Sequence, residues 1–451
     1  MRSSRPTKIV ILGGGFGGLE VARHLDRLFR RDEDVEITLV NRDNYFQFTP
    51  MLPEVAGSAI EAKHVVSPLR AFFRKVAFHE AEVEGIDVAA RTVTVAHGVT
   101  RHTHELSFDH LVLALGSVTN FRGLPGVAAN ALTFKDLGDA MVLRNRMIDL
   151  FEQADLECCA EERRSAMTFV VAGTGFSGVE LAAALWDFCH AAGRFYRNVR
   201  PDEARLLLIH PDERILPELG PELADYALQK LRTRGVDVRL KTGISATGPG
   251  WVETNTGERI PAHTLVWTAG VMVNPVLRQV GCEQDRRGAM IVNGYLEVPG
   301  CPGVWALGDC AVIPDPDTGK PYPPTAQHAI REARTLAMNL SAAIRGGEKR
   351  PFRFRSIGMF VSLGHRSAVA EVRGLRFSGF PAWWLWRTVY LAKLPTVDRR
   401  VRVAIDWTLD LFFARDFAQL RPFQERAVSA TPPKEREPVP SATAPPLIRE
   451  T

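Results

Sequence analysis

The chain has 451 residues but lacks any apolar run close to the roughly 20 residues that a membrane-spanning helix requires. Its basic N-terminus, MRSSRPTK, precedes an apolar run that is too short for the core of a signal peptide and is better interpreted as a first strand. We therefore expect neither a membrane-spanning protein nor a secreted one. The location that we predict is the cytoplasm.

Cysteine is scarce as well. The chain has six cysteines, which are irregularly spaced and include no C-x-x-C pair. This pattern argues against a disulfide framework and against a thiolate metal site, so we expect no metal ion. We also expect no nucleic acid as a partner. Cys158 and Cys159 are adjacent, and we interpret them as thiols on a charged surface helix or loop.

Apolar residues are not lacking overall, since they make up 45% of the chain, which is enough for two or three hydrophobic cores. Strand-like and helix-like segments alternate along the sequence, as is typical of α/β proteins. Two of the strand-to-helix connections are rich in glycine, in KIVILGGGFGGLEVARHL and TFVVAGTGFSGVELAAAL. Both have the spacing G-x-G-x-x-G, formed by Gly13, Gly15 and Gly18 in the first turn and by Gly173, Gly175 and Gly178 in the second.

These turns suit the binding of two dinucleotides. The strand must turn sharply into a helix, bare backbone must approach a pyrophosphate, and the unpaired N–H groups of the helix must face its charge. Glycine alone removes the side-chain obstacle at all three positions. A single match can be no more than a tight connection, but two matches in the same context favour nucleotide binding.

The acidic residue that usually binds the ribose at the end of the next strand is missing twice. Asn41 stands at that position after the first turn, where it can still bond a ribose hydroxyl. After the second turn the position is taken by His210, with Arg214 nearby, and neither penalises a ribose phosphate as a carboxylate does. The choice between NADH and NADPH is therefore open.

The two turns begin two similar units, and the predicted fold class is α/β with two Rossmann-like domains. In the first unit we expect a helical segment at residues 68–76, two short strands, and a strand DHLVLALGS that ends at Gly116. The second unit ends in the same way at HTLVWTAG. The strand and turn in CPGVWALGDCAVIP, followed by a helix from near Thr325, are expected to complete the first domain. The predicted limits are 1–120 with 285–350 for the first domain, 121–284 for the second, 351–427 for a C-terminal region and 428–451 for a disordered tail.

The C-terminal region is basic and rich in tryptophan. Residues 372–426 hold ten Lys or Arg and five Asp or Glu, a net charge of +5 against +4 for the whole chain, and four of the eight tryptophans. Amphipathic helices that lie at a membrane surface have this composition. The two candidates are residues 382–394 and 401–413, separated by Pro395. The alternative is a helical hairpin that packs on the protein or on a second copy of the chain.

From residue 8 to about residue 420, the chain resembles the type II NADH dehydrogenases. These are single-subunit NADH:quinone oxidoreductases that do not pump protons, and they belong to the two-dinucleotide-binding flavoproteins. The most specific matching pieces are NYFQFTPMLPEVAG, VWALGDCA, PPTAQHA and SIGMFVSLGHRSAVAEVRGLRFSGFPAWWLWRTVYLAKL. General flavin reductases share the glycine turns but not the last tract. The resemblance implies FAD and NADH as cofactors, with NADPH still open, and a membrane quinone as the acceptor.

By this resemblance, the first turn would hold the FAD pyrophosphate, with Asn41 and Arg42 beside the adenosine half and Asp309 at the ribityl chain. The second turn would hold NADH. The expected cofactor-binding residues are Gly13, Gly15, Phe16, Gly17, Gly18, Asn41, Arg42, Thr49, Pro50, Gly116, Gly173, Thr174, Gly175, Phe176, Gly178, His210, Ala269, Gly270, Gly308, Asp309, Ala326, Gln327 and His328. Tyr45, Phe46 and Phe48 would flank the flavin, although core packing explains these aromatic residues equally well.

Two residues are expected to act in catalysis. Glu180 would face the nicotinamide and the flavin, although the helix dipole alone also explains a carboxylate at this position. Gln327 matches the motif A-Q-x-A-x-Q, with the flavin on one side and the quinone on the other. Arg331 stands where the second glutamine is expected, which changes the polar contacts available to a quinone. We interpret Glu180 and Gln327 as positioning and polarising groups, because a flavin carries the redox chemistry itself.

Two other functions remain open from the sequence. A sulfide:quinone oxidoreductase shares the fold but needs paired redox cysteines beside the flavin, and the six cysteines show no suitable spacing. A flavoprotein that senses NAD(P)H and recruits partners at the membrane is favoured slightly by the two missing acids. For the enzyme we expect a peripheral position on the cytoplasmic face of the cell membrane, through the C-terminal helices. We also consider a homodimer.

Overall fold

The computed structural model describes residues 5–200 and 202–419, and every structural statement below concerns these residues. The fold is that of the compact unit that ends at Phe417. The tail expected at residues 428–451 lies outside the described residues.

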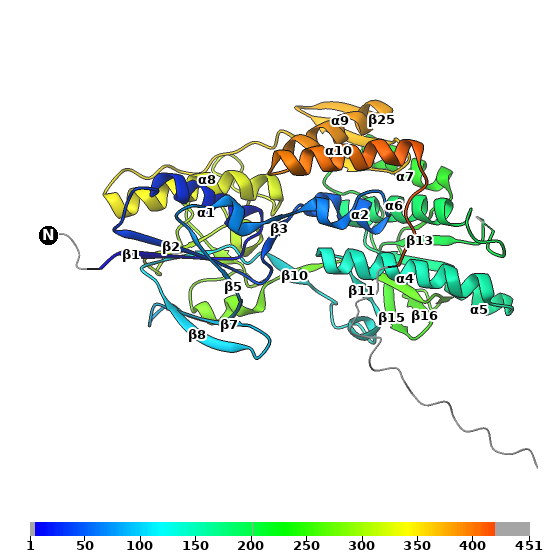
Figure 1. Ribbon diagram of the computed structural model, residues 1–451, viewed down its shortest axis with the longest axis horizontal. Helices are drawn as coiled ribbons and strands as arrows, with labels where there is room; N and C mark the ends of the chain where they lie inside the picture. Colours follow the sequence, from blue (N-terminus) through cyan, green and yellow to red (C-terminus); the bar gives the residue numbers. More distant parts are fainter. Residues whose placement is uncertain (1–4, 201, 420–451) are drawn as a thin grey trace, which may run out of the picture. The chain divides into compact units, whose positions relative to one another are not determined.

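A five-stranded parallel sheet carries the first glycine turn. Its strands lie in the order β21 (Val304–Ala306), β9 (His110–Leu113), β1 (Thr7–Leu12), β2 (Val35–Asn41) and β5 (Ala77–Glu80). The apolar strand β1 continues through the turn into α1 (Phe16–Leu28), which packs against α8 (Ala326–Arg345), as Figure 1 shows. Because β21 pairs with β9, this late segment of the chain belongs to the first sheet. The domain limits given above stay a prediction.

A second five-stranded parallel sheet carries the second turn. Its strands lie in the order β11 (Leu132–Thr133), β18 (Thr264–Trp267), β12 (Thr168–Ala172), β13 (Arg205–Ile209) and β14 (Asp237–Arg239). All five residues of β12 are buried, as expected for a central parallel strand. The helices of this part are α3 (Val127–Asn130), α4 (Leu137–Leu156), α5 (Ala160–Ala166), α6 (Phe176–Ala192) and α7 (Pro221–Arg234). Helix α4 begins with a capping box, in which Asp136 and Asp139 each accept from the other's backbone N–H.

The segments that leave the two sheets pair with each other. After Gly116, β10 (Ser117–Thr119) runs antiparallel to β19 (Val271–Val273), which follows Gly270. The remaining small sheets are formed by β3 (Tyr45–Gln47) with β4 (Val66–Pro68), by β6 (Glu82–Asp87), β7 (Thr92–His97) and β8 (His102–Ser107), by β15 (Ile244–Gly248), β16 (Trp251–Thr254) and β17 (Arg259–Pro261), by β20 (Met290–Ile291) with β22 (Ala311–Val312), and by β23 (Gly358–Ser362), β24 (Ala368–Val372) and β25 (Leu375–Gly379).

Several short helical segments complete the fold. These are α2 (Leu52–Ala56) and the 3₁₀ helices η1 (Thr49–Met51), η2 (Ala62–Val65), η3 (Leu69–Phe72), η4 (Pro275–Val280) and η5 (Gly308–Cys310). Helix α2 packs against both α4 and α6.

The predicted helix at residues 68–76 is wrong. Only the short η3 forms there, and Pro68 instead pairs with Tyr45 in the β3–β4 ladder. Beyond η3, Phe73 is extended and the chain then bends at Arg74 and Lys75, whose backbone N–H groups donate to the buried Asp26 carboxylate. These hydrogen bonds also lower the pKa of Asp26, against the effect of its burial, which is the largest influence and raises it. The two short strands expected next are in fact four, β5 to β8.

The C-terminal region forms two helices, as predicted, but the second begins earlier. Helix α9 (Phe380–Lys393) lies within two residues of the predicted segment, whereas α10 (Val397–Phe412) begins four residues before the expected start. Thr396 is the N-cap of α10, and Asp398 in its first turn is stabilised by the helix dipole. Among the described residues, no helix is long and apolar enough to cross a bilayer.

Candidate active site

The first glycine turn leaves bare backbone facing a cavity. A Cβ at Gly18 would lie 1.8 Å from Gly13 O, and one at Gly13, where φ is +99°, would lie 2.3 Å from Ala114 O. Backbone packing therefore requires both glycines. A Cβ at Gly15 would meet no atom within 4 Å, and Gly15, the N-cap of α1, lines a cavity of about 630 Å³. The open position and the helix N-terminus together suit a phosphate group.

Asn41 lines this cavity, but its amide also holds the turn. Its Oδ1 accepts from Gly14 N at 2.7 Å, and its Nδ2 donates to Asp43 O at 2.8 Å. Arg42, a further lining residue, bonds Asp136 at 3.2 Å and Asp43 at 3.3 Å. The sequence could not show that the residue in place of the acid braces the glycine turn.

A chain of polar side chains lines another part of the same cavity. Asp309 Oδ2 accepts from Ser117 Oγ at 2.5 Å, and Lys135 Nζ donates to the same hydroxyl at 2.8 Å. Burial lowers the pKa of Lys135, and Asp309 opposes that shift. Asp309 was expected from the family resemblance, whereas Lys135 was not, because nothing in the local sequence of Lys135 separates it from a surface lysine.

Glu332 of α8 was also missed. It is buried, and its Oε2 accepts from Gly308 N at 2.8 Å, so it fixes the turn that carries Asp309. Burial is the main cause that raises the pKa of Glu332 to about 7. Gly116 and Gly308 both line the cavity, and both have positive φ, as their turns require.

The start of α8 is held by its own side chains. Ala326 lines the first cavity, but the two residues after it do not belong to the cavity lining. The His328 ring is buried, with Nδ1 at 2.7 Å from Thr325 Oγ1, and it packs against Tyr322 and Phe354. His328 therefore stabilises the helix start.

The Gln327 amide binds the chain that follows α8. Its Nε2 donates to Ser356 Oγ at 2.9 Å, and its Oε1 accepts from Ile357 N at 3.3 Å. The Arg331 guanidinium lies 5.7 Å from the Phe354 ring centroid. The α8 helix thus presents Ala326, but not the Gln327 amide, to the first cavity.

The second turn repeats the geometry of the first. A Cβ at Gly178 would lie 2.0 Å from Gly173 O, and one at Gly173 would lie 2.9 Å from Ala269 N, whereas Gly175 is again open. Two buried polar atoms here, Thr174 Oγ1 and His210 Nδ1, have no hydrogen-bond partner among the described residues. Such atoms suit a site that a polar ligand completes. His210 Nε2 lies 3.0 Å from Asp212 Oδ2.

Glu180 is buried on α6 and lines a second cavity of about 400 Å³. Its Oε1 accepts from Ser362 N of β23 at 2.9 Å, and burial is the main cause that raises its pKa to about 8. Pro50 lines this cavity, whereas its neighbour Thr49 lines the first one. The two cavities therefore meet the chain at adjacent residues of η1.

The aromatic residues near η1 are divided between core and cavity. Phe46 and Phe48 are buried and contact the ring of Phe16 edge-on, at centroid distances of 5.1 and 5.8 Å. Tyr45 lines the first cavity. Core packing thus accounts for the two phenylalanines.

Comparison with known proteins identifies the family. Residues 7–333 match the model of the pyridine nucleotide-disulphide oxidoreductases, and residues 357–416 match the NDH2 C-terminal domain. Two proteins of Mycobacterium tuberculosis named type II NADH:quinone oxidoreductase are similar: Ndh is 30% identical over 91% of this chain and 89% of that one, and NdhA is 32% identical over 92% of this chain and 88% of that one. The chain belongs to the type II NADH:quinone oxidoreductase family.

The fold agrees with this membership. A solved structure of NDH2 from Plasmodium falciparum in complex with NADH superposes with a TM-score of 0.85, covering 92% of this chain and all of that one, at 20% identity. At that level of identity the likeness concerns the fold alone. The match to the NDH2 C-terminal domain, over residues 357–416, contains both C-terminal helices, α9 and α10.

The cysteines that are not in a disulfide do not form the redox pair that a sulfide:quinone oxidoreductase needs. Cys158 and Cys159 are exposed at the loop before α5, as predicted, while Cys189 and Cys310 are buried single thiols. Burial raises the pKa of Cys310 to about 12, which makes it a poor nucleophile. Among the described residues, no group of three or more His, Cys, Asp or Glu side chains could hold a metal ion.

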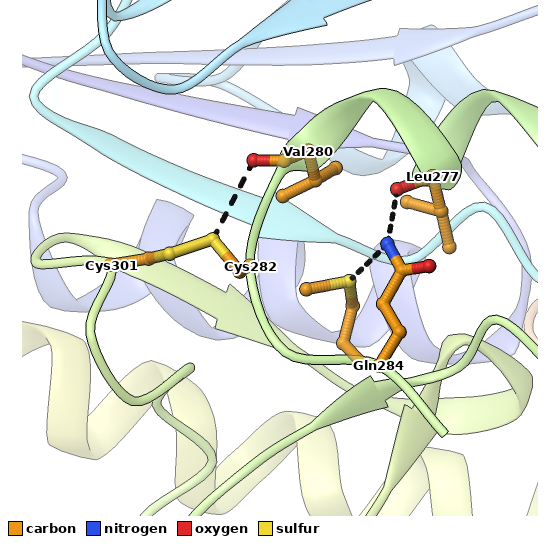
Figure 2. Close-up of a disulfide and its surroundings, with 6 residues drawn as sticks. Leu277, Val280, Cys282, Gln284 and Cys301 are labelled. Carbon is orange, nitrogen blue, oxygen red and sulfur yellow. Dashed lines mark hydrogen bonds between the residues drawn. A yellow bond between two sulfur atoms is a disulfide. The ribbon is translucent and has the colours of Figure 1, made fainter. Parts of the chain in front are cut away.

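The cysteines form no framework among the described residues, but Cys282 and Cys301 are joined by a single disulfide that the sequence did not indicate (Figure 2). It closes a loop between the end of η4 and the turn before β21. Gln284 Nε2 donates to Leu277 O at 2.6 Å beside it. The spacing of 19 residues gave no signal, because the fold of the intervening segment brings the two ends together. Neither cysteine lines the two cavities.

Proposed function

We propose that this chain oxidises NADH and passes two electrons to a membrane quinone through bound FAD. The observation that carries the proposal is the pair of glycine turns with open positions at Gly15 and Gly175, in a chain that belongs to this family. FAD, when bound, would take a hydride from NADH and give two electrons to the quinone.

The first cavity fits FAD. Gly15 and the start of α1 would receive the pyrophosphate, and Asp309 would accept from hydroxyl groups of the ribityl chain. The Lys135–Ser117–Asp309 chain of hydrogen bonds holds that carboxylate in place. Ala326 begins α8 at the cavity wall, and the positive end of the helix dipole favours negative charge there.

The second turn fits NAD(P)H. Gly175 would receive the pyrophosphate, and the unpaired Thr174 Oγ1 and His210 Nδ1 offer polar contacts. Asp212 beside His210 is a carboxylate near the expected ribose position, so it disfavours a ribose phosphate. The experiment below compares NADH with NADPH and so measures which of the two nucleotides the protein prefers.

Helix α10 supports docking on a lipid surface. Val397, Val401, Ile405, Leu409 and Phe412 are exposed and recur every three or four residues, so they share one face. Val403 and Trp407, on the other side, are buried. An apolar stripe with basic residues close by is typical of a helix that lies in a membrane interface. We propose that this face holds the enzyme at the cytoplasmic side of the cell membrane.

The experiment is anaerobic stopped-flow spectroscopy of the purified, FAD-loaded protein. NADH or NADPH should bleach the flavin absorbance, and a soluble quinone should restore it. If neither nucleotide bleaches the flavin, the enzyme assignment fails. If bleaching occurs but quinones do not reoxidise the flavin, the sensing flavoprotein is the better account.

A further inference from the structure

The second cavity contains another carboxyl group besides Glu180. Glu54 of α2 lines it, and its Oε2 accepts from the indole Nε1 of Trp407 at 3.0 Å. Trp407 lies on the buried side of α10, so the C-terminal helix fixes the position of this carboxyl. Leu411 and Phe413, at the end of α10, also line the cavity, and both are exposed.

Glu54 has no close ion pair of its own among the described residues. The Arg387 guanidinium lies between the rings of Trp383 and Trp407, at 4.2 and 4.6 Å from their centroids. Arg415 is paired with Asp410 at 2.9 Å. The other titratable or charged groups that line the cavity are Glu180, Asp187 and His190 of α6, Arg194 just after α6, and His365 and Arg366 before β24.

This environment holds Glu54 near the point where it can both bind and release a proton at neutral pH. Burial is the main cause that raises the pKa of Glu54 to about 7; Arg387 and the Trp407 indole oppose it, and Asp410 adds to it. An acid–base group is most effective when its pKa is close to the working pH. Glu180, in the same cavity, is raised further, to a pKa of about 8, and Glu54 contributes to that shift.

The proposed reaction consumes a proton from solution. Its balance is NADH + quinone + H⁺ → NAD⁺ + quinol, in which the hydride of NADH supplies two electrons and one proton. The second quinol O–H bond therefore needs one proton per turnover from outside. Because water molecules can occupy a cavity of this volume with several polar walls, they can bridge its carboxyl groups.

We propose that Glu54 is a proton-relay residue, which takes a proton from the α10 end of the cavity and passes it to the Glu180 carboxylate. Glu180 in turn gives its proton to a quinone carbonyl oxygen, and the Glu180 O–H bond breaks as the quinol O–H bond forms. The inference rests on the proposed function. It assigns Glu54 a role through Glu180, not a contact with the flavin.

The test compares Glu54→Gln with wild-type holoenzyme. Glutamine keeps an oxygen that can accept from Trp407, so we expect the fold to be retained, but it cannot carry a proton. Glu33→Gln is the matched control, since Glu33 is an exposed glutamate remote from the cavity. Bleaching by NADH should stay within about twofold of wild type, and reoxidation by quinone should slow by roughly 10- to 100-fold. Glu54→Asp should recover part of the rate, and the control should match wild type.

A second readout follows the carboxyl itself. The indole ¹H–¹⁵N signal of Trp407, assigned with Trp407→Phe, should shift with pH around neutrality in wild type and stay constant in Glu54→Gln. A wild-type rate of quinone reoxidation in Glu54→Gln, or no titration of the Trp407 signal, overturns the relay. If NADH bleaches the wild-type flavin but no quinone reoxidises it, the proposed quinone reductase function is wrong, and the relay that depends on it is wrong as well.

Discussion

The second glycine turn offers a matched pair of substitutions, Gly175→Ala and Gly178→Ala. Both add one methyl group to the same turn, but the two methyl groups meet different surroundings. At Gly175 nothing lies within 4 Å of the new Cβ, whereas at Gly178 the Cβ lies 2.0 Å from Gly173 O and 2.7 Å from Thr268 Oγ1. The first change should therefore affect the ligand, and the second should affect the fold.

The magnitudes follow from these contacts. Gly175 has φ −68° and ψ −178°, which alanine adopts without strain, so the free energy of unfolding should change by about 0.5 kcal/mol or less. A phosphate pushed away from the helix N-terminus loses a hydrogen bond to a charged group, about 1.5–3 kcal/mol, or roughly 10- to 100-fold in Kd. Gly178→Ala forces backbone movement and should destabilise the protein by at least about 2 kcal/mol.

Two measurements separate the outcomes. The rate of flavin bleaching as a function of NADH concentration gives the Kd for NADH, and thermal unfolding gives the stability. We expect Gly175→Ala to raise the Kd with an unchanged Tm, and Gly178→Ala to lower the Tm. An unchanged Kd in Gly175→Ala would refute the placement of the pyrophosphate at this turn, and a Gly178→Ala protein as stable as wild type would refute the packing argument.

Three further predictions concern other parts of the chain. Val401→Asp with Ile405→Asp should reduce co-sedimentation with anionic vesicles by about tenfold or more and leave bleaching by NADH unchanged, because both side chains are exposed, at 53% and 52%. Glu180→Gln should gain free energy of unfolding relative to wild type as pH rises from the unfolded pKa of 4.5 through about 8, by at most about 5 kcal/mol. The reason is that, in this pH range, Glu180 holds a proton in the folded wild type that the unfolded chain releases. Chemical denaturation of both proteins at several pH values measures the difference. The double variant Cys282→Ser, Cys301→Ser should be about 3 kcal/mol less stable than oxidised wild type in denaturant titrations, because it lacks the disulfide that closes a 19-residue loop. If the variant is also less stable than reduced wild type by this amount, the disulfide is not the cause.

Local pattern was enough to predict the two sheets. The apolar strands β1 and β12 are each followed by three spaced glycines, and the turns they form require glycine, since Cβ atoms at Gly18 and Gly178 would overlap a backbone oxygen. The return of β21 to the first sheet was predicted from its apolar sequence and its Gly-Asp turn. The segment after Pro68 was not, because a carboxylate more than 40 residues earlier, that of Asp26, binds its backbone.

The second cavity could be predicted only in part. Glu180 was expected from the family resemblance, but Glu54 was not, although it lies in the matching piece NYFQFTPMLPEVAG. Its surroundings depend on Trp407, which is 353 residues further along the chain. Lys135 and Glu332 were missed for the same reason, because their burial is decided by distant segments and not by their neighbours.

Helix α10 joins the expected membrane surface to the second cavity through its two faces. On the inner face, Trp407 bonds Glu54, and Asp406 accepts from Glu61 N at 3.1 Å and lies 2.5 Å from His64 Nδ1. Just after the helix, Arg415 donates to Gly57 O at 2.9 Å. These polar contacts hold the helix on the protein without using the apolar stripe. The stripe is therefore free to enter lipid, and changes on the outer face should release the enzyme from vesicles without disturbing the carboxyl groups inside.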